Sequence, residues 1–131
     1  MANKRALIVD DDANNLGILA ELLSLEGVAN TGVQNPNKLG SVLANLDPVD
    51  VIFLDLEMPG LNGYQVLEML RADERFQGVP VVAYTVHVSE ISVTRQVGFD
   101  SFLGKPLDPD QFPKQLERIL TGGSVWSTSR T

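Results

Sequence analysis

The sequence predicts an α/β protein in which five parallel strands form a doubly wound sheet and five helices cover both faces. Short continuous apolar segments, typical of strands buried on both sides, alternate with segments whose apolar residues recur at helical spacing. The two densest apolar segments, residues 6–9 and 51–54, both stop at an aspartate, Asp10 and Asp55. Strands that alternate with helices require a mostly parallel sheet with helices on both faces.

The first half of the chain supplies three expected strands and two expected helices. Gly27 is a stop signal after the first helix, and Pro36 precedes the second. Asn30 and Gly32 dilute the second strand, which is the weakest of the three. In chain order we expect a strand, a helix, a strand, a helix and a strand at residues 6–9, 16–23, 28–33, 39–46 and 51–54.

The second half continues the alternation after a loop at residues 59–63. The helix at 89–97 is weak, because Ser92, Val93 and Thr94 are poor helix formers. Asp108 and Pro109 are expected to supply the N-cap and the first-turn proline of the last helix. The expected helix, strand, helix, strand and helix carry residues 66–70, 79–85, 89–97, 101–104 and 112–120.

The chain of 131 residues fits one domain, which we place at residues 1–120. Residues 121–131 lack periodicity and are expected to form a flexible C-terminal tail or the start of a linker. Trp126 lies in this tail, where we expect it to be disordered; the alternative is an anchor for a partner protein.

Composition excludes several classes of function. Hydrophobic residues make up 44% of the chain, which supports a packed core, and the formal charge is −7. So acidic a chain is expected to bind neither nucleic acid nor membrane. There is no cysteine, hence no disulfide and no thiolate chemistry. The apolar run at the start is too short for a signal peptide, so we expect a cytoplasmic protein.

Polar residues stand where the expected strands end. Asp10 and Asp11 end the first strand, Asp55 the third, Thr85 the fourth and Lys105 the fifth. In a parallel sheet these ends share one edge, and ligands bind there where the strand order reverses. With the order 2-1-3-4-5, the reversal lies between the first and third strands and brings the three aspartates together.

Three neighbouring carboxylates need a cation, because like charges raise one another's pKa. Mg²⁺ fits best, since it binds through few carboxylates and leaves positions for phosphate oxygens; Mn²⁺ is an alternative. Lys105 adds a positive charge and Thr85 a hydroxyl donor. Together these groups would stabilise a transferring phosphoryl group, and an aspartate can itself become an acyl phosphate.

Four segments carry a resemblance to a known family. LIVDDD (7–12), VIFLDLEMPGLNGYQVL (51–67), VVAYT (81–85) and GFDSFLGKP (98–106) resemble the receiver domain of two-component response regulators. The resemblance runs from about residue 5 to 120, with each landmark in order. It implies a flavodoxin-like fold and a domain that catalyses its own Mg-dependent phosphorylation and dephosphorylation, rather than an enzyme acting on other substrates.

The resemblance also implies roles for individual residues. Asp55 matches the phosphoacceptor, Asp10 and Asp11 match the acidic pair that holds Mg²⁺, and the backbone carbonyl of Glu57 matches a further metal ligand. Asp55 itself also belongs to the implied metal site.

Further landmarks match on the later strands. Thr85 and Lys105 match the groups that hold the phosphoryl oxygens, and Phe102 matches the switch aromatic that acts with Thr85. The peptide bond between Lys105 and Pro106 matches one that is usually cis. Val86 departs from the family pattern, where a small residue is usual, and a branched side chain there could narrow access for water or for a donor histidine. His87 is expected to be an exposed loop residue; the sharper interpretation is that Glu57 and His87 flank the phosphoryl group and tune its hydrolysis.

The implied function is a phosphorylation-activated switch. The phosphoryl donor would be a sensor histidine kinase or a histidine phosphotransfer protein, and output would pass through protein contacts on the face formed by the fourth helix, fifth strand and fifth helix. Two alternatives come from other classes. A phosphatase of the haloacid-dehalogenase type would use Asp10 and Asp12 as its D-x-D pair, but Ala13 and Asn14 do not continue its pattern. A flavodoxin-like electron carrier is disfavoured, because three carboxylates would repel the flavin phosphate and no Ser/Thr/Gly-rich phosphate loop follows the first strand.

Overall fold

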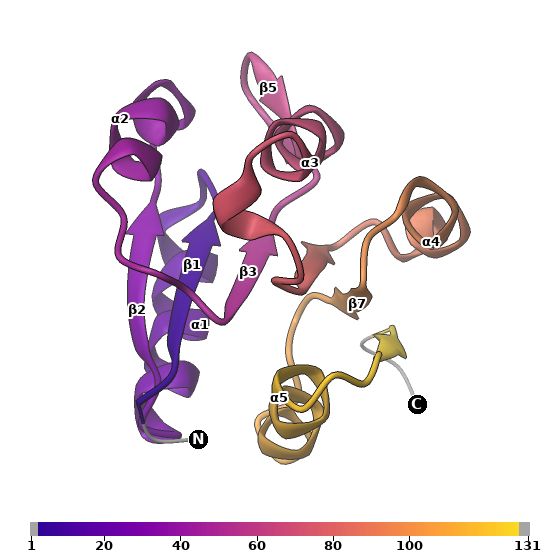
Figure 1. The fold of residues 1–131 in the computed structure, drawn as a ribbon. Helices are drawn as coiled ribbons and strands as arrows, with labels where there is room; N and C mark the ends of the chain where they lie inside the picture. Colours follow the sequence, from indigo (N-terminus) through magenta and orange to yellow (C-terminus); the bar gives the residue numbers. More distant parts are fainter. Residues whose placement is uncertain (1–2, 129–131) are drawn as a thin grey trace.

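The computed structural model describes residues 3–128, and within them the strands and helices alternate as expected (Figure 1). The strands are β1 (Arg5–Val9), β2 (Ala29–Val33), β3 (Val51–Leu54), β4 (Glu57–Met58), β5 (Leu61–Asn62), β6 (Val81–Thr85), β7 (Ser101–Gly104) and β8 (Trp126–Ser127). The helices are α1 (Ala13–Leu25), α2 (Leu39–Ala44), α3 (Gly63–Arg71), α4 (Ile91–Val97) and α5 (Phe112–Leu120), with short 3₁₀ turns at Pro36–Lys38, Glu74–Phe76 and Val88–Glu90.

The main sheet is parallel throughout, in the order β2-β1-β3-β6-β7-β8. Its first five members confirm the predicted order 2-1-3-4-5, with the reversal between β1 and β3. The sixth strand, β8, was not expected, and it lies on the open edge of β7 (Figure 1). A two-stranded antiparallel ribbon, β4–β5, was not expected either: β4 precedes the predicted loop at residues 59–63, and β5 lies within it.

Alternation along the strands produces two cores. Ala6 and Ile8 face α1 and α5, whereas Leu7 and Val9 face α2 and α3, and all four are completely buried. Strands buried on both faces explain the continuous apolar segments in the sequence. Each layer of helices packs its apolar stripe on one side of the sheet, so the strand ends are held rigidly.

The C-terminal end of α2 and the N-terminal cap of α5 differ from the prediction. α2 has only six residues because the helical spacing is shared with a 3₁₀ turn before it and a turn at Asn45 after it. α5 begins at Phe112, so the prediction that Asp108 and Pro109 start this helix is wrong. The Asp108 carboxylate instead accepts from the backbone N–H of Asp110 and closes a separate turn, and the proline in the first turn of α5 is Pro113.

The expectation of an unstructured tail does not hold for residues 121–128. The chain turns back after α5 and pairs with β7 between α4 and α5 (Figure 1). Residues 129–131, the remainder of the expected tail, lie outside the described residues. Among residues 3–128 no helix has the length and apolar character needed to cross a membrane.

Candidate functional site

Three carboxylates meet at the carboxyl ends of β1 and β3. Ligand oxygens of Asp10, Asp11 and Asp55 lie within 4.8 Å of one another. The backbone ladder fixes two of these positions: the N–H of Asp10 donates to the carbonyl of Val33, and the N–H of Asp55 donates to the carbonyl of Val9. The prediction that the reversal of strand order brings the three aspartates together is confirmed.

Lys105 reaches the carboxylates from the end of β7. Its Nζ lies 2.8 Å from Oδ2 of Asp10 and 3.7 Å from Oδ1 of Asp55. Its side chain is only 5% exposed and that of Asp10 is completely buried. The ammonium also lies 4.5 Å from the ring centroid of Tyr84, a cation–π contact that the sequence did not reveal. The following peptide bond, Lys105–Pro106, is cis, as the resemblance implied.

The environment of Asp55 makes its carboxyl a weaker acid than an exposed aspartate. Burial raises the pKa of the Asp55 carboxyl to about 6; the Lys105 ammonium acts against this, while the negative charge of Asp10 adds to it. Burial together with the charges of Asp10 and Asp55 also raises the pKa of the Tyr84 hydroxyl. Even with the Lys105 ammonium in place, the site therefore carries an excess of negative charge that a bound cation would neutralise.

The backbone around Asp55 is tightly packed. The N–H of Glu57 lies 3.5 Å from Oδ1 of Asp55, and Gly63 begins α3 directly against the strand end. A Cβ atom at position 63 would lie 2.7 Å from the Asp55 carbonyl oxygen, so only glycine fits. The sequence indicated Gly63 as a loop residue, and nothing in its local pattern revealed this close approach.

Asp12 serves the fold near the site. Its carboxylate caps α1 by accepting from the backbone N–H groups of Asn14 and Asn15, at 2.9 and 3.1 Å. The N–H of Asp12 in turn donates to Oδ1 of Asp10 at 2.9 Å. The first turn of the helix thus helps to orient the buried carboxylate, and Asp12 is a capping residue outside the carboxylate cluster.

The other side of the site is formed by the end of β6. Thr85 is 1% exposed, and its hydroxyl oxygen accepts from the backbone N–H of His87 at 3.1 Å. The imidazole Nε2 of His87 lies 3.0 Å from a carboxylate oxygen of Glu57, which joins the loop after β6 to β4 across the rim. Val86 is 58% exposed at this rim.

Phe102 is already completely buried, in the core shared with α2 and α3. In the register of the sheet it pairs with Ala83, two residues before Thr85. A phenyl ring has no polar group that favours water, which accounts for its burial here.

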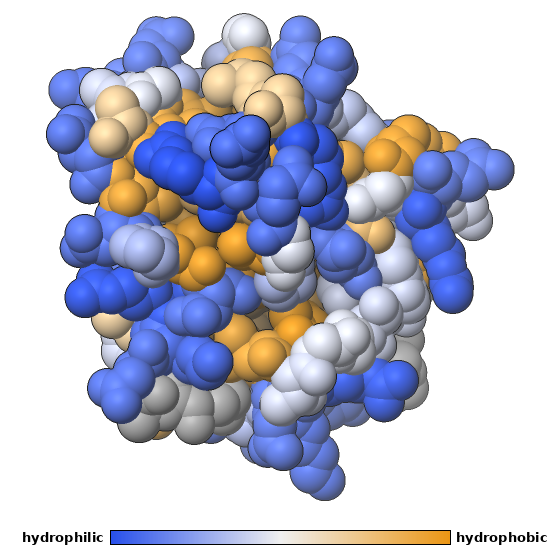
Figure 2. Space-filling model, viewed as in Figure 1, coloured by the Kyte–Doolittle hydropathy of each residue, from blue (hydrophilic) through white to orange (hydrophobic). Residues whose placement is uncertain are grey.

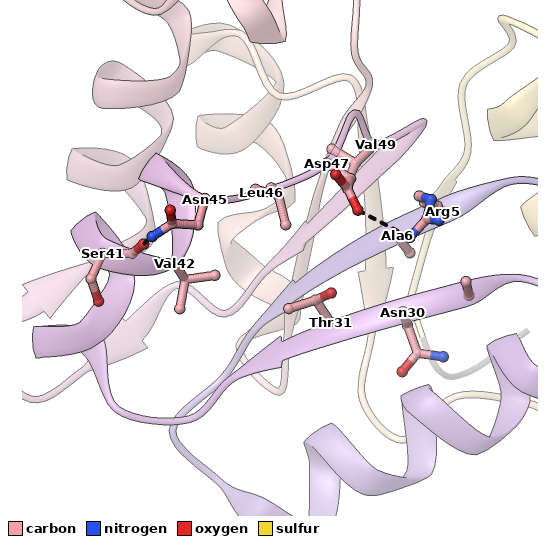
Figure 3. Close-up of a pocket in the computed structure, with 11 residues that line it drawn as sticks. Arg5, Ala6, Asn30, Thr31, Ser41, Val42, Asn45, Leu46, Asp47 and Val49 are labelled. Atoms are coloured by element: carbon pink, nitrogen blue, oxygen red, sulfur yellow. Dashed lines mark hydrogen bonds and ion pairs between the residues drawn. The ribbon is translucent and has the colours of Figure 1, made fainter.

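A separate hollow of about 420 Å³ lies between β1, β2 and the short helix α2, away from the carboxylates (Figure 3). Val42, Leu46 and Val49 provide apolar walls, and an ion pair between Arg5 and Asp47 crosses its rim. Figure 2 shows apolar residues at the bottom of the hollows on this face, with hydrophilic residues around them. This hollow has no cluster of catalytic groups, whereas the site described above has one.

The donor set at the strand ends suits a hard divalent cation. Three carboxylates at one point, with a single ammonium as counter-charge, leave a net negative site made of oxygen ligands. Mg²⁺ and Mn²⁺ prefer such ligands. The backbone carbonyl of Glu57, two residues after Asp55, remains a predicted further ligand, which would add an uncharged oxygen to this set.

Comparisons with known proteins agree with this site. The family description "Response regulator receiver domain" matches residues 6–117. The protein PilH of Pseudomonas aeruginosa is 31% identical over 120 residues, covering 90% of this chain and 98% of PilH. Stress response regulator protein 1 of Candida tropicalis is 35% identical over 128 residues, but the chain spans only 46% of its length.

Solved structures show the same fold. The chemotaxis protein CheY4 of Vibrio cholerae aligns with a TM-score of 0.78 at 22% identity, covering 90% of this chain and 99% of CheY4. The receiver domain of a sensor histidine kinase from Pseudomonas aeruginosa aligns with a TM-score of 0.77 at 25% identity, covering 92% of this chain and all of that one, and it holds a magnesium ion in its active-site cleft. The chain is thus neither a haloacid-dehalogenase phosphatase nor a flavodoxin-like electron carrier: it belongs to the response regulator receiver domain family.

Proposed function

We propose that this chain is a phosphorylation switch that accepts a phosphoryl group on Asp55 from a phosphohistidine of a sensor histidine kinase or a histidine phosphotransfer protein in the cytoplasm. The observation that carries the proposal is the meeting of Asp10, Asp11 and Asp55 around the buried ammonium of Lys105. Membership of the receiver family supports the same class of signalling.

The chemistry follows from the side chains present. A carboxylate oxygen of Asp55 forms a bond to phosphorus as the bond between phosphorus and the donor imidazole nitrogen breaks, and the electron pair stays on that nitrogen. Asp10, Asp11, Asp55 and the carbonyl of Glu57 would hold Mg²⁺ or Mn²⁺, which supplies positive charge at the phosphoryl oxygens.

Lys105 and Thr85 act on the transferred group itself. We expect the Lys105 ammonium, 3.7 Å from Oδ1 of Asp55, to donate to a phosphoryl oxygen, and the buried hydroxyl of Thr85 at the end of the neighbouring strand β6 to donate to another. The Thr85 oxygen meanwhile accepts from the N–H of His87, so its movement would pull on the loop that leads into α4. Repacking of the buried Phe102 ring would pass this change to a protein target on the face formed by α4, β7 and α5.

Incubation with acetyl phosphate and Mg²⁺, followed by mass spectrometry, tests the phosphoacceptor. We expect a gain of one phosphoryl group on the native chain and none on Asp55→Asn, because an amide cannot form the acyl phosphate. Asp12→Asn is the matched control, since asparagine also caps helices and Asp12 lies outside the carboxylate cluster. A gain of phosphate at the native level on Asp55→Asn would point to another acceptor.

Titration with Mg²⁺ and with Mn²⁺ tests the cation site. Asp11→Ala should weaken binding of either ion and slow phosphorylation, yet stabilise the metal-free protein, because one of three crowded negative charges is removed. Unchanged affinity for both ions would contradict a shared acidic site.

Amide chemical shifts with and without beryllofluoride, a phosphoryl mimic, test the output. We expect changes around Asp55 and also over residues 86–112, including Phe102. Changes confined to the loops around Asp55 would mean that the signal does not reach the face formed by α4, β7 and α5.

A further inference from the structure

The C-terminal segment, defined here as residues 124–128, occupies the open edge of the sheet. Its short strand β8 pairs in parallel with β7, so that Phe102 lies opposite Trp126 and Leu103 opposite Ser127. It runs between α4 and α5, which places it on the face assigned above to the protein target (Figure 1).

Backbone hydrogen bonds tie this segment to the start of β7. The N–H of Phe102 donates to the carbonyl of Val125 at 2.7 Å, and the N–H of Val125 donates to the hydroxyl of Ser101 at 2.9 Å. Without these contacts the edge of β7 would present an unpaired backbone, which readily accepts another strand. The segment therefore fills a position that an extended peptide from another molecule could fill in the same way.

Side chains of this segment also pack on both sides of the sheet. Trp126 packs on the core that contains Phe102, and the guanidinium of Arg95 in α4 lies 5.1 Å from its ring centroid. Val125 packs on the opposite core, beside α5. Both side chains stay partly exposed, and the ladder is only two residues long. A strand of two partly exposed residues is held less firmly than the longer, buried strands β1, β3 and β6.

A glycine turn delivers the segment to the edge. Gly122 adopts φ +95, and the N–H of Gly123 donates to the carbonyl of Arg118 at 2.8 Å. The Arg118 guanidinium also donates to the carbonyl of Ser124 at 2.7 Å. The segment is thus tethered within a few residues of α5, which gives it a high effective concentration at β7.

We propose that residues 124–128 are an intramolecular ligand of the β7 edge, and that the protein target displaces them by pairing an extended segment of its own, with a large aromatic residue opposite Phe102, in parallel with β7. The inference uses the proposed function only in assigning this face to the target. The alternative is a fixed strand that permanently covers the edge.

Two measurements on the unphosphorylated full chain distinguish these cases, so neither depends on chemistry at Asp55. A fluorescein-labelled peptide with the sequence of residues 121–128 is titrated against the native chain, Trp126→Ala and Trp126→Phe. Hydrogen exchange of the Phe102 amide, which donates to Val125, is measured in the same three proteins. Circular dichroism verifies that each variant is folded.

We expect the peptide to bind Trp126→Ala at least tenfold more tightly than the native chain, because the tethered competitor is weakened. The Phe102 amide should exchange through local opening in the native chain, at least tenfold faster in Trp126→Ala, and close to the native rate in Trp126→Phe, which keeps an aromatic ring beside Arg95. Peptide binding that is absent or equal in all three proteins, or exchange of Phe102 only by global unfolding, would overturn the proposal. Peptide-independent formation of dimers by Trp126→Ala would overturn the choice of a foreign segment in favour of a second copy of this chain.

Discussion

The carboxylate site lies at the carboxyl ends of the strands, and β8 covers the outer edge of the same sheet at β7. The two regions are held by different kinds of contact. At the site, Lys105 and Asp10 are almost wholly enclosed and joined at 2.8 Å. At the edge, Trp126 is partly exposed and is held by a two-residue ladder, by packing on the core beside Phe102 and by a cation–π contact with Arg95. If either partner of a buried ion pair moves away, the other is left as an uncompensated buried charge. A short edge strand can dissociate without leaving such a charge behind. The first region is suited to fixed chemistry and the second to exchange of partners.

Removing the charge of Lys105 should have the largest effect on stability. We expect Lys105→Met to lower the free energy of unfolding by about 3 kcal/mol without metal, because the fully buried Asp10 loses its counter-charge. Urea denaturation in a chelator measures the change, with Lys114→Met on the exposed side of α5 as the control. Equal stability of the two variants would show that Asp10 does not depend on Lys105.

The second prediction concerns the pH dependence of stability, and here the substitution is expected to stabilise the protein. Burial raises the pKa of Asp55 to about 6 in the folded protein, above its ordinary value of 3.8, so the folded state binds this proton more tightly than the unfolded state. This contribution to stability is present at low pH and is lost as pH rises from about 4 to about 6. Asp55→Asn does not titrate and should be more stable than the native chain by about 2 kcal/mol at pH 7 without metal.

Denaturation of both proteins in a chelator from pH 4 to pH 7 measures the difference. The gap should open across that range and stay constant above it. A stability difference that does not change with pH would mean that the pKa of Asp55 is not raised. The stability of the site would then, like that of the edge, not depend on the ionisation of a buried carboxyl.

The two regions also differ in how well the sequence predicts them. The site could be predicted because Asp10, Asp55, Thr85 and Lys105 each follow an apolar strand, and parallel topology alone brings strand ends together. The edge could not, because Ser124–Thr128 has a single aromatic residue and no periodicity. Its strand is formed by pairing with β7, a tertiary contact that no local pattern encodes.

Single residues missed within the predicted region have the same explanation. Gly63 is required by the carbonyl of Asp55, and Tyr84 contributes its ring to Lys105 across two neighbouring strands. The start of α5 was misplaced because Asp108 can close a turn as well as cap a helix, and the local sequence does not distinguish these uses.

Truncating Trp126 should cost less than removing Lys105. Trp126→Ala is expected to lower the free energy of unfolding by about 1 to 2 kcal/mol, below the usual cost for a fully buried indole, because the ring is partly exposed. The rate of phosphorylation by acetyl phosphate should stay within about twofold of the native rate, because the ring contacts Arg95 and the core beside Phe102 and does not belong to the cluster of three carboxylates. A loss of stability equal to that of Lys105→Met would erase the contrast between the two regions.

The smallest effect on stability is expected at the rim of the site, where Glu57 and His87 meet at 3.0 Å with both side chains largely exposed. Exposed pairs contribute about 0.5 kcal/mol, so His87→Ala and Glu57→Ala should unfold almost as the native chain does. The pair nevertheless joins the segments that follow Asp55 and Thr85, and we expect its loss to open the site to water. We expect each variant to shorten the lifetime of the phosphorylated protein about two- to fivefold, the rate equivalent of such a weak contact.

The double variant of Glu57 and His87 should shorten this lifetime no more than either single variant does, because the pair acts as a unit. Glu68→Gln, on the exposed side of α3, is the control. Additive losses in the double variant would mean that Glu57 and His87 act on the phosphoryl group separately, without a shared gate between water and Asp55.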